Sequence, residues 1–341
     1  MIHLQGQLMP GLEEILGGFI LMSLTLYGLL GGADYGAGIW YLLARGREGH
    51  AQRQLIATAI GPIWEANHVW LILVVTLLFS AFPAAYARMS TVLHIPLTLL
   101  LIGIVLRGSA FAFRSYDVRQ SPLHRFWGMI FGLSSVITAM FLGITLGTVA
   151  SSNLQYHQGG FFEVFVQAWI QPFPLAVGIW TVTLFALLAA IYLIHETSIP
   201  ALRELFRRRA LWTMAATGCM ALLVFFLAHN EAPDIRQDLL HRWSGRIIMS
   251  MALLGMIICV VGLWINRYHL ARAAAIGYVT AIIWGWGLSH YPYLIKPDLT
   301  IYNSAAPSQT LELLLFVLGA GMIVVLPSLL YLFNVFKKSQ V

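Results

Sequence analysis

Apolar runs long enough to cross a membrane recur along almost the whole chain, and they constrain its fold more than any other feature. A bilayer core about 30 Å thick requires roughly 20 apolar residues per helix. Because a backbone exposed to lipid must satisfy its own hydrogen bonds, we expect each such run to be a helix. Nine runs have this length, at 14–43, 55–81, 88–112, 125–149, 170–195, 210–230, 244–266, 270–290 and 310–336.

The composition agrees with a membrane protein of many spans. Of 341 residues, 59% are hydrophobic and 10% are charged, and the mean hydropathy is +0.78; soluble domains have about 25% charged residues. We therefore expect a single all-α integral membrane domain, 1–341, with about nine transmembrane helices in two four-helix bundles plus one peripheral helix. The loops are too short for a soluble domain, although FFEVFVQAW (161–169) could form a short helix in the membrane interface.

The basic residues indicate how the chain is oriented in the membrane. If the nine segments alternate in direction, fifteen of the twenty Lys and Arg residues fall on one side. The positive-inside rule places that side in the cytoplasm, so the N-terminus lies outside and the C-terminus inside. The net charge of +6 is thus explained by topology and does not indicate nucleic-acid binding. The two cysteines, Cys219 and Cys259, fall in apolar segments and suggest no disulfide.

Two carboxylates, Asp34 and Glu65, lie deep inside predicted helices. A charge at the membrane centre costs about 2.5–3.5 kcal/mol on insertion scales, so such a group usually faces a partner or a wet cavity. Asp34 precedes Arg45 by eleven residues and Glu65 follows Arg53 by twelve, so both lie roughly 16–18 Å from the cytoplasmic ends of their helices. Neighbouring antiparallel helices could bring them together as a proton-carrying pair, or each could be a neutral carboxyl that fixes helix packing.

Polar and aromatic residues surround Glu65 in the stretch IGPIWEANHVWLI (60–72). Gly61-Pro62 should weaken the helix just before it, and Trp64, Asn67 and His68 follow within one turn. We expect Asp34, Glu65, His68, Asn67 and Trp64 to be candidates for a proton path. Glu-x-x-His is also a ligand spacing of di-iron proteins, but the sequence contains no second copy. His229 and His290 lie at similar depth on different predicted helices, as the two ligands of a haem would. Histidines at the ends of membrane spans more often form hydrogen bonds with loops. We therefore expect no metal or cofactor in this chain.

Glycines and arginines mark two further features of the first four segments. Gly28, Gly32 and Gly36 line one helix face, where a neighbouring helix can approach closely. Arg107 and Arg114, in LRGSAFAFRS (106–115), bracket an aromatic stretch at the cytoplasmic end of the third segment. Both are candidates for an interface or a lipid anchor, and simple snorkelling of the side chains is the alternative.

Four motifs together resemble subunit II of the cytochrome bd-type quinol oxidases. They are GGADYGAGIW (31–40), AIGPIWEANHVWLI (59–72), AFPAAYA (81–87) and LRGSAFAFRS (106–115). The likeness is greatest to the cyanide-insensitive branch, which also has W-E-A-N-H-V-W. All four motifs fall in 1–150, the first four predicted helices. The last five, in 151–341, resemble the family only in their general character as membrane-spanning helices.

The resemblance implies a role in a bacterial or archaeal cytoplasmic membrane. Such a complex oxidises quinol and reduces dioxygen to water. Its haem b and haem d (or a further haem b) lie in subunit I, which would be the partner of this chain. Small single-helix accessory subunits are possible further partners besides quinol and lipid. Subunit II carries no haem, stabilises subunit I and lines a cytoplasmic proton path. By that likeness Glu65 replaces the family's aspartate after Trp, and Asp34 matches the second aspartate of D-G-F-D.

One position departs from the family pattern. Gly31 stands where the family has the first aspartate of D-G-F-D, so a path that needs both carboxylates would be interrupted unless water fills the space beside the glycine. Two other functions remain open. A proton-coupled secondary transporter would use Asp34 and Glu65 to couple protons to a solute, and a purely scaffolding subunit would use every polar group structurally.

Overall fold

The computed structural model describes residues 10–46, 48–60, 64–116, 122–151, 154 and 160–338, and these are almost entirely helical. The first predicted segment is one continuous span, Leu12–Leu43. It consists of α1 (Leu12–Leu26), a single π-helical turn η1 (Tyr27–Gly31) and α2 (Gly32–Leu43). π-turns inside helices occur frequently at functional sites, and this one lies directly before Asp34.

The second predicted segment corresponds to α3 (Gly49–Ile60) and α4 (Trp64–Ala81), which the structure describes on either side of residues 61–63. The predicted weakening at Gly61-Pro62 falls outside the described residues. Beyond α4 the chain turns by 117° into α5 (Pro83–Val92). Pro83 occupies the start of α5, where its missing N–H costs nothing. α6 (His94–Tyr116) then runs back along the molecule.

The remaining elements follow the predicted order. They are α7 (Pro122–Ala150), α8 (Phe161–Phe165), α9 (Pro172–His195), α10 (Pro200–Glu231), α11 (Pro233–His241), α12 (Trp243–Trp264), α13 (Tyr268–His290), the hairpin β1 (Tyr293–Ile295) and β2 (Leu299–Thr300), and α14 (Ser308–Lys338). The short helix expected within 161–169 is α8. The small strands and α11 were not predicted, because two or three paired residues leave no periodic signal.

Seven helices of the described residues are long and apolar enough to cross a membrane, and the bent pair α4–α5 raises the number to at most eight. The segment expected at 270–290 is α13, a helix as long as α6 that is not among these seven. The chain is therefore a helical protein of many membrane spans. The expected total of nine is not established by these helices.

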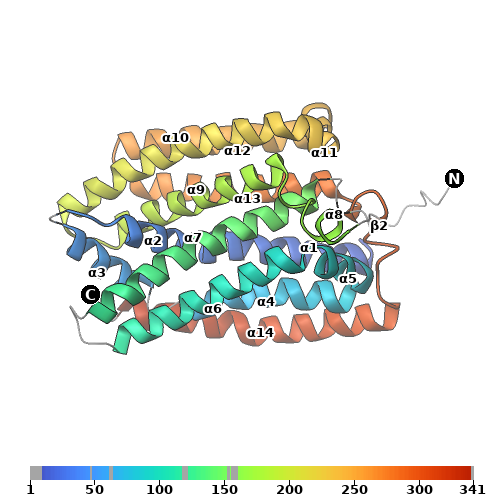
Figure 1. The fold of residues 1–341 in the computed structure, drawn as a ribbon, viewed down its shortest axis with the longest axis horizontal. Helices are drawn as coiled ribbons and strands as arrows, with labels where there is room; N and C mark the ends of the chain where they lie inside the picture. Colours follow the sequence, from blue (N-terminus) through green and yellow to red (C-terminus); the bar gives the residue numbers. More distant parts are fainter. Residues whose placement is uncertain are drawn as a thin grey trace.

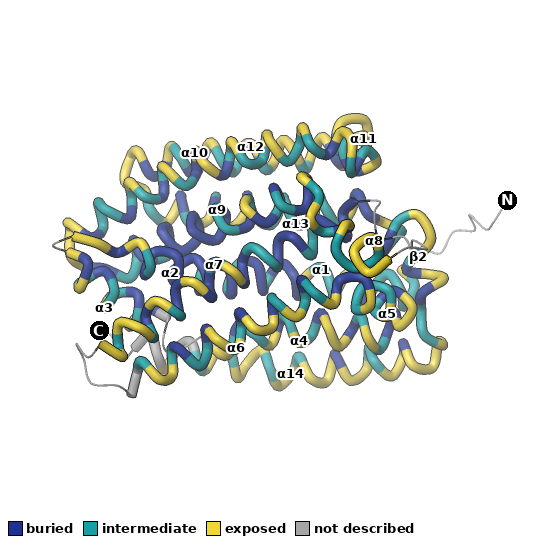
Figure 2. The backbone as a smooth tube through the Cα atoms, viewed as in Figure 1, coloured by how far each residue is buried: buried dark blue, intermediate teal, exposed yellow. Residues whose placement is uncertain are grey.

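The helices pack side by side, and α2, α7 and α9 lie inside (Figure 1). α9 is the most buried span, whereas α10, α12 and α14 expose most of their surface (Figure 2). The turns α2–α3, α9–α10 and α12–α13, the end of α6 and the end of α14 gather at one end of the molecule, on the left of Figure 1. The segments that carry the arginine excess thus share one end; hereafter we call it the basic end.

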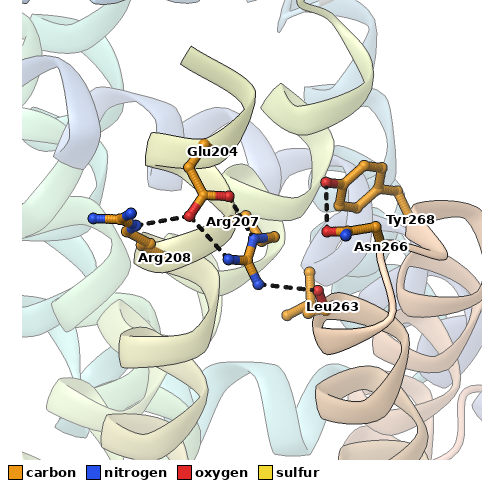
Figure 3. A network of polar contacts seen from close by, with 6 residues as sticks. All are labelled: Glu204, Arg207, Arg208, Leu263, Asn266 and Tyr268. Atoms are coloured by element: carbon orange, nitrogen blue, oxygen red, sulfur yellow. Dashed lines mark hydrogen bonds and ion pairs between the residues drawn. The ribbon is translucent and has the colours of Figure 1, made fainter. Parts of the chain in front are cut away.

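An ion-pair network ties α10 to the α12–α13 turn at the basic end (Figure 3). Glu204 accepts hydrogen bonds from Arg207 and Arg208, both with N···O distances of 2.7 Å at Nε. Arg207 also donates to the Leu263 carbonyl oxygen at 3.4 Å. The positive φ of 57° at Asn266 lets the chain reverse in this turn. Here the arginine charges are balanced by a carboxylate of the same helix.

Candidate functional site

Glycines let α9 and α7 approach α2 closely around Asp34. A Cβ added at Gly36 would lie 1.8 Å from the Phe185 carbonyl oxygen of α9, and one at Gly38 would meet Ser135 of α7. Gly32 faces the Phe185 ring in the same way. The close approach expected from the glycine spacing is confirmed. It seals Asp34, which is 5% exposed, inside the bundle.

Asn67 of α4 is the hydrogen-bond partner of Asp34. Its Nδ2 donates to Asp34 Oδ2 at 2.5 Å and lies 3.5 Å from the Leu30 carbonyl oxygen in the π-turn. Asn67 is itself only 2% exposed. The structure therefore brings together two of the five predicted path residues. The bond links the first predicted segment to the second.

Arg107 of α6 is the cation whose charge acts on the Asp34 carboxyl. Its side chain is 1% exposed, and its Cζ lies 5.0 Å from the Tyr35 ring centroid and 5.2 Å from that of Phe131. A guanidinium between two aromatic faces gains from the attraction of a cation to a ring. The predictions of a lipid anchor, an interface contact or a snorkelling side chain are therefore wrong for Arg107, because it points inward and away from the surface of this chain.

Two tyrosines that the sequence reasoning missed complete the interior cluster. The hydroxyl groups of Tyr27 and Tyr35 are hydrogen-bonded at 2.7 Å, and the His68 ring lies 6.1 Å from Tyr27 and 6.2 Å from Tyr35, centroid to centroid. Tyr27 precedes Asp34 by seven residues, a spacing that puts both on nearly one helix face. This spacing was the available signal. We refer to Tyr27, Asp34, Tyr35, Asn67, His68 and Arg107 as the interior polar cluster.

Glu65 lies on a different face of α4 and is exposed. It precedes Asn67 by two residues, which is about 200° around a helix, so the two side chains point in nearly opposite directions. Glu65 begins an outward stripe of exposed residues at helical spacing: Val69, Ile72, Thr76 and Phe79. The predicted Asp34–Glu65 pair is therefore wrong, because the Glu65 side chain points away from the helix face that carries Asn67 and contacts Asp34.

Two further expectations concern positions near these carboxylates. A Cβ at Gly31 would lie 3.0 Å from Cε2 of Tyr27, so a tyrosine ring lies beside this position, and water at Gly31 stays a prediction. Trp64 is the first residue of α4, but its side chain lies outside the described residues, so its predicted role stays a prediction.

Arg114 of α6 lies at the basic end, where its Cζ is 4.4 Å from the Tyr41 ring centroid. Its Nε donates to His124 Nε2 at 3.3 Å. Unlike Arg107, Arg114 is only partly buried. Of the two arginines predicted as interface or lipid anchors, Arg114 alone reaches the surface of this chain.

Two observations concern the metal and haem ligands that the sequence suggested. No cluster of three or more His, Cys, Asp or Glu residues among them could hold a metal. His290, one of the two histidines considered as haem ligands, has Nδ1 3.2 Å from the Trp286 carbonyl oxygen and Nε2 3.2 Å from that of Val149. Both ring nitrogens thus face backbone oxygens, which leaves neither directed toward an iron.

Comparison with known proteins gives a consistent family. Residues 12–336 match the model of the family described as cytochrome bd terminal oxidase subunit II. The cytochrome bd ubiquinol oxidase subunit 2 of Bacillus subtilis is 29% identical over 71% of this chain and 68% of its own length. The cytochrome bd-I ubiquinol oxidase subunit 2 of Escherichia coli K12 is 26% identical over 52% and 48%, respectively. A chain of the bd oxidase from Geobacillus thermodenitrificans has the same fold, with a TM-score of 0.79, 24% identity, and coverage of 95% of this chain and 98% of that one.

Proposed function

Because the chain belongs to the cytochrome bd terminal oxidase subunit II family, we propose that it is the haem-free subunit that stabilises a haem-bearing subunit I. The complex is an oxidoreductase that oxidises quinol and reduces dioxygen to water. Haem b and haem d, or a further haem b, belong to subunit I and supply the electron transfer and oxygen chemistry. The residues of this chain supply helix packing and proton-carrying groups.

In this proposal the chain is a single domain that crosses the membrane nine times, with α13 as the additional span. The basic end faces the cytoplasm, which puts the N-terminus outside and the C-terminus inside. The spans form two four-helix bundles plus one peripheral helix, and the membrane is the bacterial inner membrane. In this proposal α10, α12 and α14 face the lipid, which agrees with their exposed apolar surfaces.

The observation that carries the proposal is the position of Glu65 on the outward stripe of α4. Val69, Ile72 and Phe79 of that stripe are 38%, 62% and 61% exposed in this chain. A carboxylate on an apolar face at mid-membrane depth needs a partner, and a second subunit packed on this face would provide it. We therefore place subunit I against the outward stripe, with Glu65 as the proton-carrying group at the interface.

The interior polar cluster has a different role in this proposal. Asn67 connects it to α4, two residues from Glu65, so a change at Asp34 or Arg107 alters the position of the helix that carries Glu65. Asp34 and Asn67 hold α4 in place from its interior face and thereby position Glu65 on the proton path. His68 lies between the interior and the outward face of α4. The proton enters from the basic end and reaches Glu65 without passing through Gly31.

Purification of the chain with its partner, followed by a reduced-minus-oxidised visible spectrum, tests the assembly. Haem bands that travel with a larger polypeptide support it, whereas a chain that elutes alone and haem-free contradicts it and favours the transporter. Within the assembled complex, Glu65→Gln should lower quinol-dependent oxygen consumption roughly 10²-fold, the effect of losing a positioned proton-transfer group, with haem content unchanged.

Glu312→Gln is the matched control, since Glu312 is an exposed glutamate near the start of α14. It should leave oxygen consumption at the wild-type rate. Wild-type turnover in Glu65→Gln would contradict the proton path and leave the scaffolding role alone.

A further inference from the structure

Three guanidinium groups from different helices cover two adjacent aromatic residues at the basic end of α2. Arg53 of α3 and Arg114 of α6 have their Cζ atoms 5.4 Å and 4.4 Å from the Tyr41 ring centroid. Arg209 of α10 lies 4.7 Å from the ring of the neighbouring Trp40. Each arginine gains from the face of an aromatic ring. Arg53 and Arg114 thus lie over the same ring and Arg209 over the ring of the preceding residue; we call these three side chains the arginine site.

Hydrogen bonds hold each of these side chains in place. Arg53 Nη2 donates to the Ala44 carbonyl oxygen at 3.0 Å, and Arg209 Nη2 donates to Gln52 Oε1 at 3.0 Å. Gln52 precedes Arg53 and is 3% exposed, so it joins the two arginines through α3. A freely snorkelling arginine would not be fixed in this way. The site is therefore built by packing, in contrast to a mobile basic loop.

No carboxylate in the described part of the chain forms an ion pair with the arginine site. Within the same residues, Arg53 Nε and Arg209 Nη1 are buried and lack a hydrogen-bond partner. Some other cations do pair with an acid: Glu204 binds two arginines at this same end (Figure 3), and Arg88 binds Asp298 at 3.1 Å at the other. Like charges that are held in a partly buried place without an acid of this chain favour the binding of an anion.

We propose that the arginine site binds the phosphate of an anionic phospholipid in the cytoplasmic leaflet. Guanidinium groups bind phosphate oxygens through paired, charge-assisted hydrogen bonds, and basic pockets between membrane helices on the cytoplasmic side recognise anionic lipid headgroups. Exposed apolar side chains, Leu43 at 49% and Phe113 at 54%, lie beside the site in sequence. Apolar side chains of this kind pack against the acyl chains of a lipid. Free phosphate has no acyl chain.

This inference rests on the proposed function only where it assigns the basic end to the cytoplasmic leaflet. Its readout is lipid bound to the purified complex, which does not depend on turnover. A wild-type rate of oxygen consumption in Glu65→Gln would therefore overturn the proton path and leave the lipid result unaffected. Loss of lipid selectivity would overturn the lipid site and leave the proton path unaffected.

The test is native mass spectrometry of the detergent-purified complex, exchanged into phosphatidylcholine and titrated with phosphatidylglycerol. The double variant Arg53→Gln/Arg114→Gln should weaken phosphatidylglycerol binding about tenfold or more, because each basic residue contributes to attraction of an anionic lipid. The control Arg208→Gln removes an arginine at the same end whose charge Glu204 already balances, and it should bind like the wild type. Equal loss in both variants would overturn the proposal.

Two further measurements keep the proposal falsifiable if the double variant does not assemble. The wild-type complex must bind phosphatidylglycerol in preference to phosphatidylcholine, and lack of a preference would overturn it. Inorganic phosphate, added alone as a competitor, should not displace the lipid. Complete displacement would show a site for free phosphate and would overturn the assignment to a lipid.

Discussion

Asp34 and Glu65 show how two carboxylates at one depth in neighbouring helices can belong to different environments. Asp34 is enclosed by α2, α7 and α9, accepts a hydrogen bond from Asn67 and feels the charge of the buried Arg107. Glu65 stands on the outward stripe of α4, among exposed apolar side chains. One carboxylate is satisfied within the chain, and the other is left for a partner.

The difference comes from helical phase. A shift of two residues turns a side chain about 200° around its helix, so Asn67 faces the interior while Glu65 faces outward. Residue counts along a helix give depth, but they do not give the rotation of one helix relative to another. The comparison predicts that changes in the interior polar cluster reduce stability and that changes at Glu65 reduce turnover with little effect on stability.

Replacement of Arg107 by Gln should give the largest loss of stability. It removes a buried cation whose charge acts on the buried Asp34 carboxyl, and leaving a buried charge uncompensated costs about 3–5 kcal/mol. The thermal unfolding midpoint of the purified complex measures the effect. A midpoint equal to that of the wild type would show that Asp34 does not depend on Arg107, and the distinction between the two carboxylates would lose its basis.

Gly36→Ala tests the close contact of α2 with α9 that encloses Asp34. The added Cβ would lie 1.8 Å from a backbone oxygen, so we expect a loss of about 1–3 kcal/mol from overpacking. Gly319→Ala in α14 is the matched control, since nothing lies within 4 Å of its Cβ position. Urea titration of both variants should separate them, and equal midpoints would contradict the packing described here.

Asn67→Leu should have a smaller effect, about 1–3 kcal/mol, because it leaves the buried Asp34 carboxyl without a hydrogen bond. Adding Asp34→Asn to Asn67→Leu should recover part of the loss, since the remaining buried group is then neutral. The unfolding midpoints of the two single variants and the double variant measure this coupling. Simple additivity would indicate that the two residues do not interact.

Glu65→Gln should change stability least, because Gln keeps the size of Glu and the side chain points out of this chain. Oxygen consumption should nevertheless fall as described above. A stability loss similar to that of Arg107→Gln would show that Glu65 is a structural residue, and the contrast with Asp34 would disappear.

Much of the fold could be predicted from the sequence, because membrane spans leave a long apolar signal. The family resemblance, the short helix at 161–169 and the close contacts at Gly32 and Gly36 were all readable from residue types and spacing. The 117° bend between α4 and α5 was not, since the spacing of apolar residues does not give the angle between two helices. The polarity of α13 similarly leaves its span assignment a proposal.

The site was predictable in most of its members, Tyr27 and Tyr35 excepted, and not in its arrangement. Asp34 and Asn67 were both singled out, and they do contact each other. Arg107 was assigned to the surface because an arginine near a helix end usually snorkels, whereas contacts with Tyr35 and Phe131 from other helices hold it inside. Those contacts are tertiary, so no spacing within α6 could reveal them.

The most direct test of the account is a photo-crosslink from the outward stripe of α4. p-Benzoylphenylalanine placed at Glu65 or Ile72 in the assembled complex, followed by irradiation, should yield an adduct with the haem-bearing subunit I. The same group at Leu254 of α12, which is 56% exposed, should yield none. Adducts with subunit I from Leu254, and none from positions 65 and 72, would contradict the claim that Glu65 faces the partner subunit.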